Sequence, residues 1–296
     1  MAAITRVGVV AKSKLQAATP HLVDVEKWLA AHGVTAIVET ATAALMPPDG
    51  GRRVADKQSL VGEVGLVLVL GGDGTLLSMA DCIGRAGLNV PILGVNFGSL
   101  GFLTEVTLPE LYPALEAALA GQAHIEERLT LSATITRSHS APTTDIAVND
   151  VVINKGARSR LIDLSISVGD GLVTRVRADG LIIATPTGST AYNLAAGGPI
   201  VQPNVEALVL TPIAPHTLTN RPIVIPSSSS VRVKPMMDER PGSDEVFVTF
   251  DGQAASELHA GDEISVCRAR EPMRLIRPAT RSYYEVLREK LNWGKR

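Results

Sequence analysis

The chain has 296 residues, of which 45% are hydrophobic and 20% are charged, and its net charge is −2. This composition is typical of a soluble globular protein. The sequence has no basic run of the kind that binds nucleic acid, and no apolar run approaches the roughly 20 residues needed to span a bilayer. The two cysteines, Cys82 and Cys267, lie far apart, which favours a reducing cytoplasm over a disulfide framework or a zinc site.

The first third of the chain alternates between strand and helix patterns. Residues 4–11 have a strand pattern and lack the long apolar region of a signal peptide. Apolar residues then recur at helical spacing between Thr19-Pro20 and Gly33. Further strands are expected at 36–38, 66–70 and 90–95, helices from Thr75 and over 111–119, and a loop over 44–60. This alternation predicts a doubly wound, Rossmann-like α/β domain with a parallel sheet.

The strand at 66–70 continues into Gly71-Gly72-Asp73-Gly74-Thr75. Such a turn lies at the carboxyl end of a sheet, where open α/β folds bind ligands, and its glycines and the helix start suit phosphate. Asp73 would repel phosphate unless it binds a metal or takes a proton from the group that attacks the phosphate. The alternative is a tight turn capped by Asp73. The Rossmann glycine pattern is absent, because its third glycine is Leu77, and so is a Walker loop.

A second glycine-rich turn, Asn96 to Leu103, ends the strand at 90–95. Thr107 and Glu110 follow at capping-box spacing and predict the start of the helix over 111–119.

From about residue 125 the apolar residues recur with period two, and short strands alternate with turn residues. Strands are expected at 129–136, 146–153, 161–168, 172–176, 207–212, 222–226, 230–234, 245–250 and 263–268. Gly169-Asp170-Gly171 is typical of a hairpin turn. The pattern predicts a layered all-β domain, interrupted by a helix-like stretch over 189–196. The tail from Tyr283 to Trp293 is helical, and we expect it to pack back on the first domain.

Three polar stretches of the second half are candidates for a site. Asn149-Asp150 interrupts an apolar strand, and burying this pair without hydrogen bonds would cost several kcal/mol of folding free energy. A carboxylate beside an amide suits a ribose diol. The alternative is a turn at the end of a strand. Arg177 and Asp179, two apart on an expected strand, hold a phosphate and an amide or pair with each other. Thr185 to Tyr192 offers hydroxyls and backbone N–H groups beside one aromatic ring, although such loops are often only turns. His216 fits a structural turn residue.

Five motifs in this order and spacing resemble the NAD kinase family, over essentially the whole chain. They are Gly71-Gly72-Asp73-Gly74-Thr75, Asn96-Phe97-Gly98, Asn149-Asp150, Asp179-Gly180 and Thr187-Gly188-Ser189-Thr190-Ala191-Tyr192. The glycine turn alone is also found in diacylglycerol, sphingosine and sugar kinases. The resemblance implies an α/β domain at 1–124, a β domain at 125–272 with most of the NAD site, and a segment at 273–296 that returns to the first domain.

The resemblance also implies the reaction and its residues. ATP would give its γ-phosphoryl group, with a divalent metal such as Mg²⁺, to the 2′-hydroxyl of the adenosine ribose of NAD, and Asp73 would be the general base. The residues expected to bind the nucleotides are Gly72, Gly74, Thr75, Asn149, Asp150, Arg160, Arg177, Asp179, Thr190, Ala191, Tyr192, Asn193, Leu194, Ala195 and Gln253. Position 150 is Asp where many members have Glu, and position 195 is Ala where Ser is expected.

We therefore expect a cytoplasmic NAD kinase that forms a homodimer or homotetramer and binds neither nucleic acid nor membrane. The alternatives are a lipid or sugar kinase with the same glycine turn, and a dinucleotide-sensing regulator without catalysis. The sequence leaves open whether polyphosphate also serves as donor.

Overall fold

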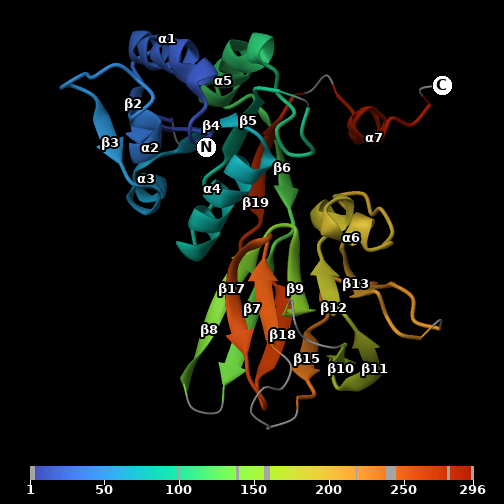
Figure 1. Ribbon diagram of the computed structural model, residues 1–296. Coiled ribbons are helices and arrows are strands. Elements are labelled where there is room, and N and C mark those ends of the chain that lie inside the picture. The colour runs from blue at the N-terminus through green and yellow to red at the C-terminus, as the bar shows by residue number, and fades with distance from the viewer. Residues whose placement is uncertain are drawn as a thin grey trace. The chain divides into compact units, whose positions relative to one another are not determined.

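The computed structural model describes residues 4–294, apart from 99, 138–139, 157–160, 218, 238–244 and 279–280. The chain forms two compact units (Figure 1): Met1–Glu127 with Met273–Arg296, and Arg128–Pro272. In the described part of the chain, no helix has the length and apolar character needed to cross a membrane.

The first unit is built on one sheet in the order β3-β2-β1-β4-β5-β19-β6. The pairs from β3 to β5, and β5 with β19, are parallel. The strand order therefore reverses between β1 and β4, as in doubly wound folds, and the expected fold class is confirmed. Its strands are β1 Arg6–Ala11, β2 Thr35–Glu39, β3 Arg53–Ala55, β4 Leu66–Gly71, β5 Ile92–Asn96, β6 His124–Arg128 and β19 Met273–Arg277.

Helices cover both faces of this sheet. Val7 and Val9 of β1 belong to one buried cluster with Leu22 of α1 and Leu115 of α5. On the opposite face, α3 and α4 approach so closely that a Cβ at Gly8 would lie 2.4 Å from Leu60, and one at Gly94 2.6 Å from Leu76. Because both faces are buried, β1 and β4 are almost entirely apolar. The helices are α1 Thr19–Ala31, α2 Thr40–Ala43, α3 Lys57–Glu63, α4 Asp73–Arg85, α5 Leu111–Leu119 and α7 Tyr283–Leu291, with short 3₁₀ turns at Gln16–Ala18 and Leu108–Glu110.

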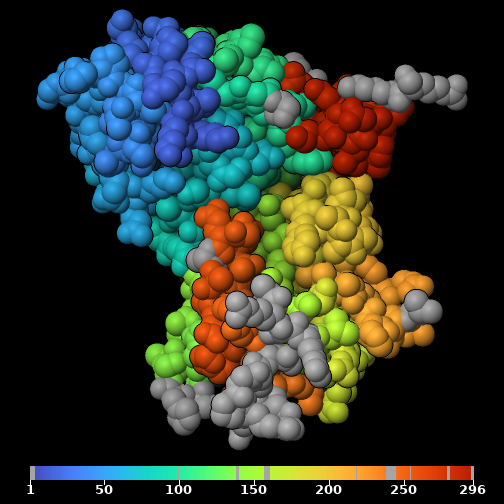
Figure 2. All heavy atoms as spheres, in the orientation of Figure 1, coloured from blue at the N-terminus to red at the C-terminus, as the bar shows by residue number. Residues whose placement is uncertain are grey.

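The C-terminal segment belongs to the first unit. β19 pairs with β5, and Figure 2 shows the spheres of α7, in red, against the green surface of this unit. Lys290 of α7 lies 5.8 Å from the ring centroid of Phe102. The helical tail was expected to return here, whereas strand β19 was not expected.

The second unit is a sandwich of two antiparallel sheets, ordered β11-β10-β15-β18-β7-β8 and β14-β13-β12-β9-β16-β17. One buried cluster takes Leu131 and Leu164 from the first sheet and Ile153 and Leu181 from the second. Its strands are β7 Leu131–Arg137, β8 Ser140–Ala147, β9 Asp150–Lys155, β10 Ile162–Val168, β11 Gly171–Ala178, β12 Gly180–Ala184, β13 Ala207–Ile213, β14 Ile223–Pro226, β15 Val231–Pro235, β16 Val246–Phe250, β17 Gln253–Leu258 and β18 Glu263–Arg268.

The two sheets have different sequence patterns because their outer faces differ. A 3₁₀ turn at Thr187–Thr190 and α6 Tyr192–Ala195 follow β12, and Val201 and Ala196 pack with Val152 and Ile182 on the outer face of the β12 sheet. β12 is therefore buried throughout and β9 is buried from Asp150 to Ile153, whereas β7 and β15 alternate. The chain changes sheet between β8 and β9, β9 and β10, β11 and β12, β14 and β15, β15 and β16, and β17 and β18.

Several expectations were wrong. The expected loop over 44–60 contains β3 and the start of α3. The single strand over 146–153 is two strands, β8 and β9, joined by a bend at Val148 and Asn149. The hairpin at Gly169-Asp170-Gly171 and the capping box of Thr107 and Glu110 are confirmed.

Candidate functional site

The glycine turn joins β4 to α4 in the first unit. Gly72 is the N-cap of α4 and offers no side chain to the first turn, and the Thr75 and Leu76 N–H groups donate to its carbonyl. The first N–H groups of a helix have no partner within the helix, so those of Asp73 and Gly74 are suited to an anion.

Asp73 fastens this turn to the second glycine-rich turn. Its Oδ1 accepts hydrogen bonds from the N–H groups of Leu103 (3.1 Å) and Thr104 (2.9 Å) and from the Thr104 hydroxyl (2.8 Å). Among the described residues, its Oδ2 accepts one hydrogen bond, from the Phe102 N–H at 2.8 Å. A Cβ at Gly101 would lie 2.1 Å from Oδ1, so only glycine permits this approach. Since each carboxylate oxygen has about two acceptor sites, Oδ2 keeps one for a further donor.

A cavity of about 340 Å³ opens beside the turn, at the carboxyl ends of β1, β2 and β4. Gly72, Gly74 and Thr75 line it from α4, and Lys12 and Lys57 bring two positive charges. The Lys57 ammonium donates to the Ser78 hydroxyl at 2.7 Å, which fixes its side chain toward α4. This edge is where the strand order reverses, which is the usual ligand position in doubly wound folds.

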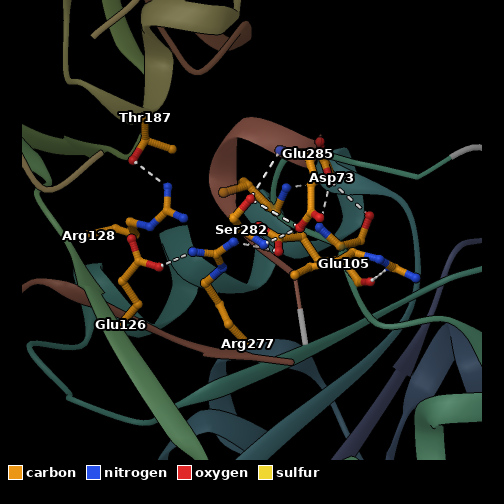
Figure 3. A network of polar contacts seen from close by, with 11 residues as sticks. Asp73, Glu105, Glu126, Arg128, Thr187, Arg277, Ser282 and Glu285 are labelled. Atoms are coloured by element: carbon orange, nitrogen blue, oxygen red, sulfur yellow. Dashed lines mark hydrogen bonds and ion pairs between the residues drawn. The ribbon is translucent and has the colours of Figure 1, made fainter. Parts of the chain in front are cut away.

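The C-terminal segment holds the chain that follows the second turn. Figure 3 shows Arg277 between two carboxylates, with Nη2 2.7 Å from Glu105 and Nη1 2.6 Å from Glu126. Burial lowers the pKa of Arg277, but the hydrogen bonds to Glu105 and Glu126 raise it more, so the net pKa is raised. Arg281 also donates to the Glu105 carbonyl at 2.7 Å. Because Glu105 follows Thr104, these contacts support the turn that surrounds Asp73.

The second turn lines another cavity of the first unit, of about 360 Å³, together with Arg281 of the C-terminal segment. Asn96 Oδ1 accepts the Gly98 N–H at 2.5 Å, and its amide donates to the Thr104 hydroxyl at 3.3 Å. Asn96 thus connects the start of the second turn to the contacts of Asp73.

In the second unit, Asp251 organises the bend between β8 and β9. Its Oδ2 accepts the Val148 N–H at 2.8 Å, and its Oδ1 accepts the N–H groups of Asn149 (2.7 Å) and Asp150 (3.1 Å). The Asp251 N–H donates back to the Asp150 carbonyl at 3.0 Å. The bend is therefore fixed by backbone contacts, which leaves the side chains of Asn149 and Asp150 for other partners.

Asp150 is 3% exposed, and no described residue forms a hydrogen bond with its carboxyl group. Burial, and secondly the negative charge of Asp251, raises the pKa of Asp150 from 3.8 to about 7. A buried carboxyl group without a hydrogen bond to protein is costly, so its position favours a ligand that supplies the missing donors.

The polar stretch after β12 is tied to the same bend. The Thr185 hydroxyl donates to the Val148 carbonyl at 2.6 Å, and a Cβ at Gly188 would lie 2.0 Å from the Asn149 carbonyl. Asn193 is buried, donates to the Ser189 and Pro199 carbonyls, and accepts from Thr211. Its side-chain amide is thereby occupied within the fold.

The remaining candidates in this stretch differ in exposure. Tyr192 is 46% exposed, and Thr190, Ala191 and Leu194 are half-buried. Ala195 is exposed. Gln253, also exposed, begins β17 two residues after Asp251, so it lies near the bend.

Arg177 and Asp179 lie away from the bend at Val148 and Asn149. β11 ends at Ala178 and β12 begins at Gly180, so the expectation that these residues share a strand and point the same way is wrong. Arg177 is exposed, and Asp179 pairs with Lys155 at 3.1 Å. Asp150 pairs with Ala184, and Asn154 with Gly180, so Asp179 lies at the opposite end of β9 and β12, roughly 15 Å from Asp150.

Arg160 lies outside the described residues. Three residues of these places were not expected from the sequence: Lys12 and Lys57 in the cavity, and Asp251 at the bend. The role of Asp251 could have been predicted in part, because Asp-Gly after a strand is typical of a turn with a positive φ. In the structure, Asp251 has a φ of 50°.

Comparison with known proteins identifies the family. A family model described as "ATP-NAD kinase N-terminal domain" matches residues 7–123, and one described as "ATP-NAD kinase C-terminal domain" matches 148–278. Relatives named NAD kinase include those of Geobacter sulfurreducens, 48% identical over 91% of this chain and 92% of the relative, and of Syntrophotalea carbinolica, 44% identical over 98% and 99%.

Two solved structures are similar over nearly the whole chain. Yeast NADH kinase complexed with NADH has a TM-score of 0.89 and 28% identity, covering 99% of this chain and 89% of that one. An NAD kinase from Archaeoglobus fulgidus in complex with ATP has a TM-score of 0.75 and 25% identity, covering 98% of this chain and 100% of that one.

Proposed function

The chain belongs to the NAD kinase family, and we propose that it transfers the γ-phosphoryl group of ATP to the 2′-hydroxyl of the adenosine ribose of NAD, which gives NADP. The observation that best supports this reaction is Asp73 at the start of α4, whose Oδ2 can accept one hydrogen bond beyond that of Phe102. Its neighbours Gly72, Gly74 and Thr75 line a cavity together with two lysines. The relatives and similar structures, named for NAD, NADH and ATP, favour this acceptor over a lipid or a sugar.

Phosphoryl transfer depends mainly on positioning and charge neutralisation. The N–H groups at the start of α4, with Lys12 and Lys57, would hold the phosphates in the 340 Å³ cavity. Asp73 Oδ2 would accept the proton of the 2′-hydroxyl as its oxygen attacks phosphorus and the bond from phosphorus to the β-phosphate oxygen breaks. ADP leaves, and the proton stays on Oδ2 until it is released.

The NAD contacts are those that the resemblance to the NAD kinase family implies. In the second unit, Asn149 and Asp150 would bind hydroxyls of the dinucleotide. In the first unit, Gly74 would approach the ribose that is phosphorylated. Thr190, Ala191, Tyr192, Leu194, Ala195 and Gln253 would line the adenine region. Thr185 and Gly188, which precede most of them in the chain, contact the bend that Asp251 fixes. Asn193 would support this wall from within the fold, because its amide is already bonded.

We propose that the divalent metal enters with ATP, as part of the substrate. Mg²⁺ is usually bound by substrate phosphates plus one or two carboxylates, and it neutralises charge on the transferred group. Among the described residues, no group of three or more His, Cys, Asp or Glu side chains could hold a metal ion.

The reaction is tested by supplying NAD, diacylglycerol and fructose 6-phosphate separately with labelled ATP and Mg²⁺. NAD is expected to be the labelled acceptor and NADP the product. Label in a lipid or sugar would indicate a kinase of the other classes. NAD binding in a calorimeter without any NADP would indicate a dinucleotide sensor. Repeating the assay with polyphosphate determines the range of donors.

We also propose that the chain forms a homo-oligomer through the β domain. β11 and β14 are the edge strands on the same side of the sandwich, and edge strands offer unpaired backbone groups. Large apolar side chains there are exposed, including Leu172 at 60% and Val224 at 53%. They flank a cavity of about 220 Å³ lined by Leu181, Leu210 and Ile223 among others. A second copy would cover this surface.

Oligomerisation would also explain how Asp179 could contact NAD. Since Asp179 lies at the far end of β9 and β12 from Asp150, a contact of Asp179 with NAD is best supplied by a neighbouring copy. This arrangement would make the site depend on assembly.

Val224→Asp is expected to weaken self-association at least roughly hundredfold, because a carboxylate buried in an apolar interface costs several kcal/mol. Sedimentation should show the variant as a smaller species than the unmodified chain. Val54→Asp is the matched control, since Val54 is 49% exposed on an edge strand of the first unit and should leave association unchanged. A fully active monomer of the unmodified chain would contradict the proposal.

We propose a cytoplasmic location, supported by Cys82 and Cys267, which are both free thiols in the structure.

A further inference from the structure

Glu39 is a buried carboxylate that the proposed reaction does not use. It is the last residue of β2, beside β1 in the sheet, and it lines the 340 Å³ cavity that Lys12 and the start of α4 line from the other side. It is 6% exposed. A buried carboxylate in a cavity suited to phosphates needs a physical explanation.

One oxygen of Glu39 is fixed by the fold. Oε2 accepts the N–H and the hydroxyl of Thr42, each at 2.8 Å, and caps α2. The Thr42 hydroxyl in turn accepts the Ala11 N–H at 2.8 Å, which ties α2 to the end of β1. These contacts hold the carboxyl group in one orientation at the cavity wall.

The other oxygen lacks a protein partner. Within the described residues, no group donates a hydrogen bond to Oε1, and no ion pair joins Glu39 to either lysine of the cavity. Because Glu39 lines the cavity, Oε1 is available there to a hydrogen-bond donor of a ligand. The ligand group should therefore be a hydrogen-bond donor, which a phosphate oxygen is not.

The sheet order gives the distance between the two ends of the cavity. The start of α4 follows β4, and Glu39 ends β2, so two strand spacings of together about 10 Å separate them. A nucleoside triphosphate with its γ-phosphate at α4 would extend past Lys12 toward β2 and bring its ribose to Glu39. In other Rossmann-like folds, an acidic residue farther along the chain also accepts a ribose hydroxyl.

We propose that Glu39 determines the preference for a ribonucleoside triphosphate as phosphoryl donor, by accepting hydrogen bonds from the 2′- or 3′-hydroxyl of its ribose. The inference rests on the proposed kinase function and adds to it a residue that recognises the donor. It assigns the phosphates to the α4 end of the cavity and the donor ribose to the β2 end.

The test compares ATP with 2′-deoxy-ATP and 3′-deoxy-ATP as donors, in the unmodified enzyme and in Glu39→Gln. In the unmodified enzyme, kcat/KM should fall roughly ten- to a hundredfold for at least one deoxy donor, since a hydrogen bond to a charged group is lost. In Glu39→Gln this preference should shrink toward equality, while KM for NAD stays unchanged. Each ratio is taken within one variant, so a change in the amount of folded protein cancels.

Two variants separate donor recognition from structural effects. Thr42→Ala loosens the cap of α2 but keeps the Glu39 carboxylate, so the preference for ATP should persist. Glu63→Gln alters an exposed carboxylate of α3 that pairs with Arg53 outside the cavity, and it should change nothing. Loss of the preference in Thr42→Ala to the same extent as in Glu39→Gln would overturn the assignment.

Other results would also overturn it. These are equal use of all three donors by the unmodified enzyme, an unchanged preference in Glu39→Gln, or a uniform loss for all donors that added Mg²⁺ or Mn²⁺ restores, which would make Glu39 a metal contact. Calorimetry with ATP and the deoxy donors tests the same preference without turnover. If no NADP forms, the proposed function fails, whereas the Glu39 assignment fails only if the binding preference is absent.

Discussion

Replacing Asp73 with Asn is expected to lower kcat by at least about two orders of magnitude, while the affinity for NAD measured by calorimetry changes little. The 2′-hydroxyl is a poor nucleophile at neutral pH, and a positioned general base typically contributes about 10²–10⁴-fold. Asn keeps the size of the side chain and one acceptor oxygen for the Leu103 and Thr104 contacts. It replaces the basic oxygen Oδ2 with an NH₂ group, which also loses the hydrogen bond from the Phe102 N–H. A loss in kcat without a loss in binding is the signature of an interaction made in the transition state.

A control variant is needed to separate proton transfer from structural support, because Asp73 also holds the turn over residues 101–104. Thr104→Val removes the hydroxyl that donates to Asp73 Oδ1 but leaves Oδ2 and its negative charge. If Asp73 is the base, Thr104→Val should retain most of kcat. An equal loss in both variants would assign Asp73 to positioning the turn. Near-normal kcat in a folded Asp73→Asn enzyme would remove it from catalysis, and rescue of that variant by added Mg²⁺ or Mn²⁺ would indicate a metal contact.

The α/β fold was predictable where strands are buried on both faces. β1 and β4 are apolar runs whose identity as strands does not depend on distant residues, and Gly71 to Thr75 marks the end of β4 by local chemistry alone. Helix α3 was not expected from the sequence, because Pro47, Pro48 and Gly50 nearby are strong turn signals. Asp56 was an available signal for the helix start, since its carboxylate caps the Gln58 and Ser59 N–H groups.

The sandwich was less predictable, because its strands change sheet. Residues 146–153 form one apolar pattern in the sequence, yet Asp251, about a hundred residues away, fixes a bend in the middle of it. β19 is equally non-local, since its strand partner β5 lies about 180 residues earlier. The sequence indicated that Asn149 and Asp150 were unusual, but only the tertiary fold shows that the carboxyl group of Asp150 is buried and that Asp179 lies at the other end of the strand pair.

For Asp150→Asn we expect KM for NAD to rise roughly ten- to a hundredfold, with little change in KM for ATP. The Asp150 carboxylate would bind NAD hydroxyls as a charged acceptor, and losing such a partner costs about 1.5–3 kcal/mol. Steady-state kinetics with each substrate varied in turn measures both constants. Equal rises for NAD and ATP would point to a structural role. Glu257→Gln, on an exposed strand residue of the same domain, is the control.

The same substitution should change how stability depends on pH. Burial, and then Asp251, raises the pKa of Asp150 from 3.8 to about 7, so between these pH values the folded chain keeps a proton that the unfolded chain has released. The free energy of unfolding therefore falls as pH rises through this window, by up to about 1.4 kcal/mol per pH unit, and the loss is complete above about pH 7. Asn has no proton to lose, so Asp150→Asn should gain stability relative to the unmodified chain across the window and keep a constant advantage above it. Urea unfolding at pH values within and above the window measures this difference, and a difference that does not change with pH would show that Asp150 is ionised throughout.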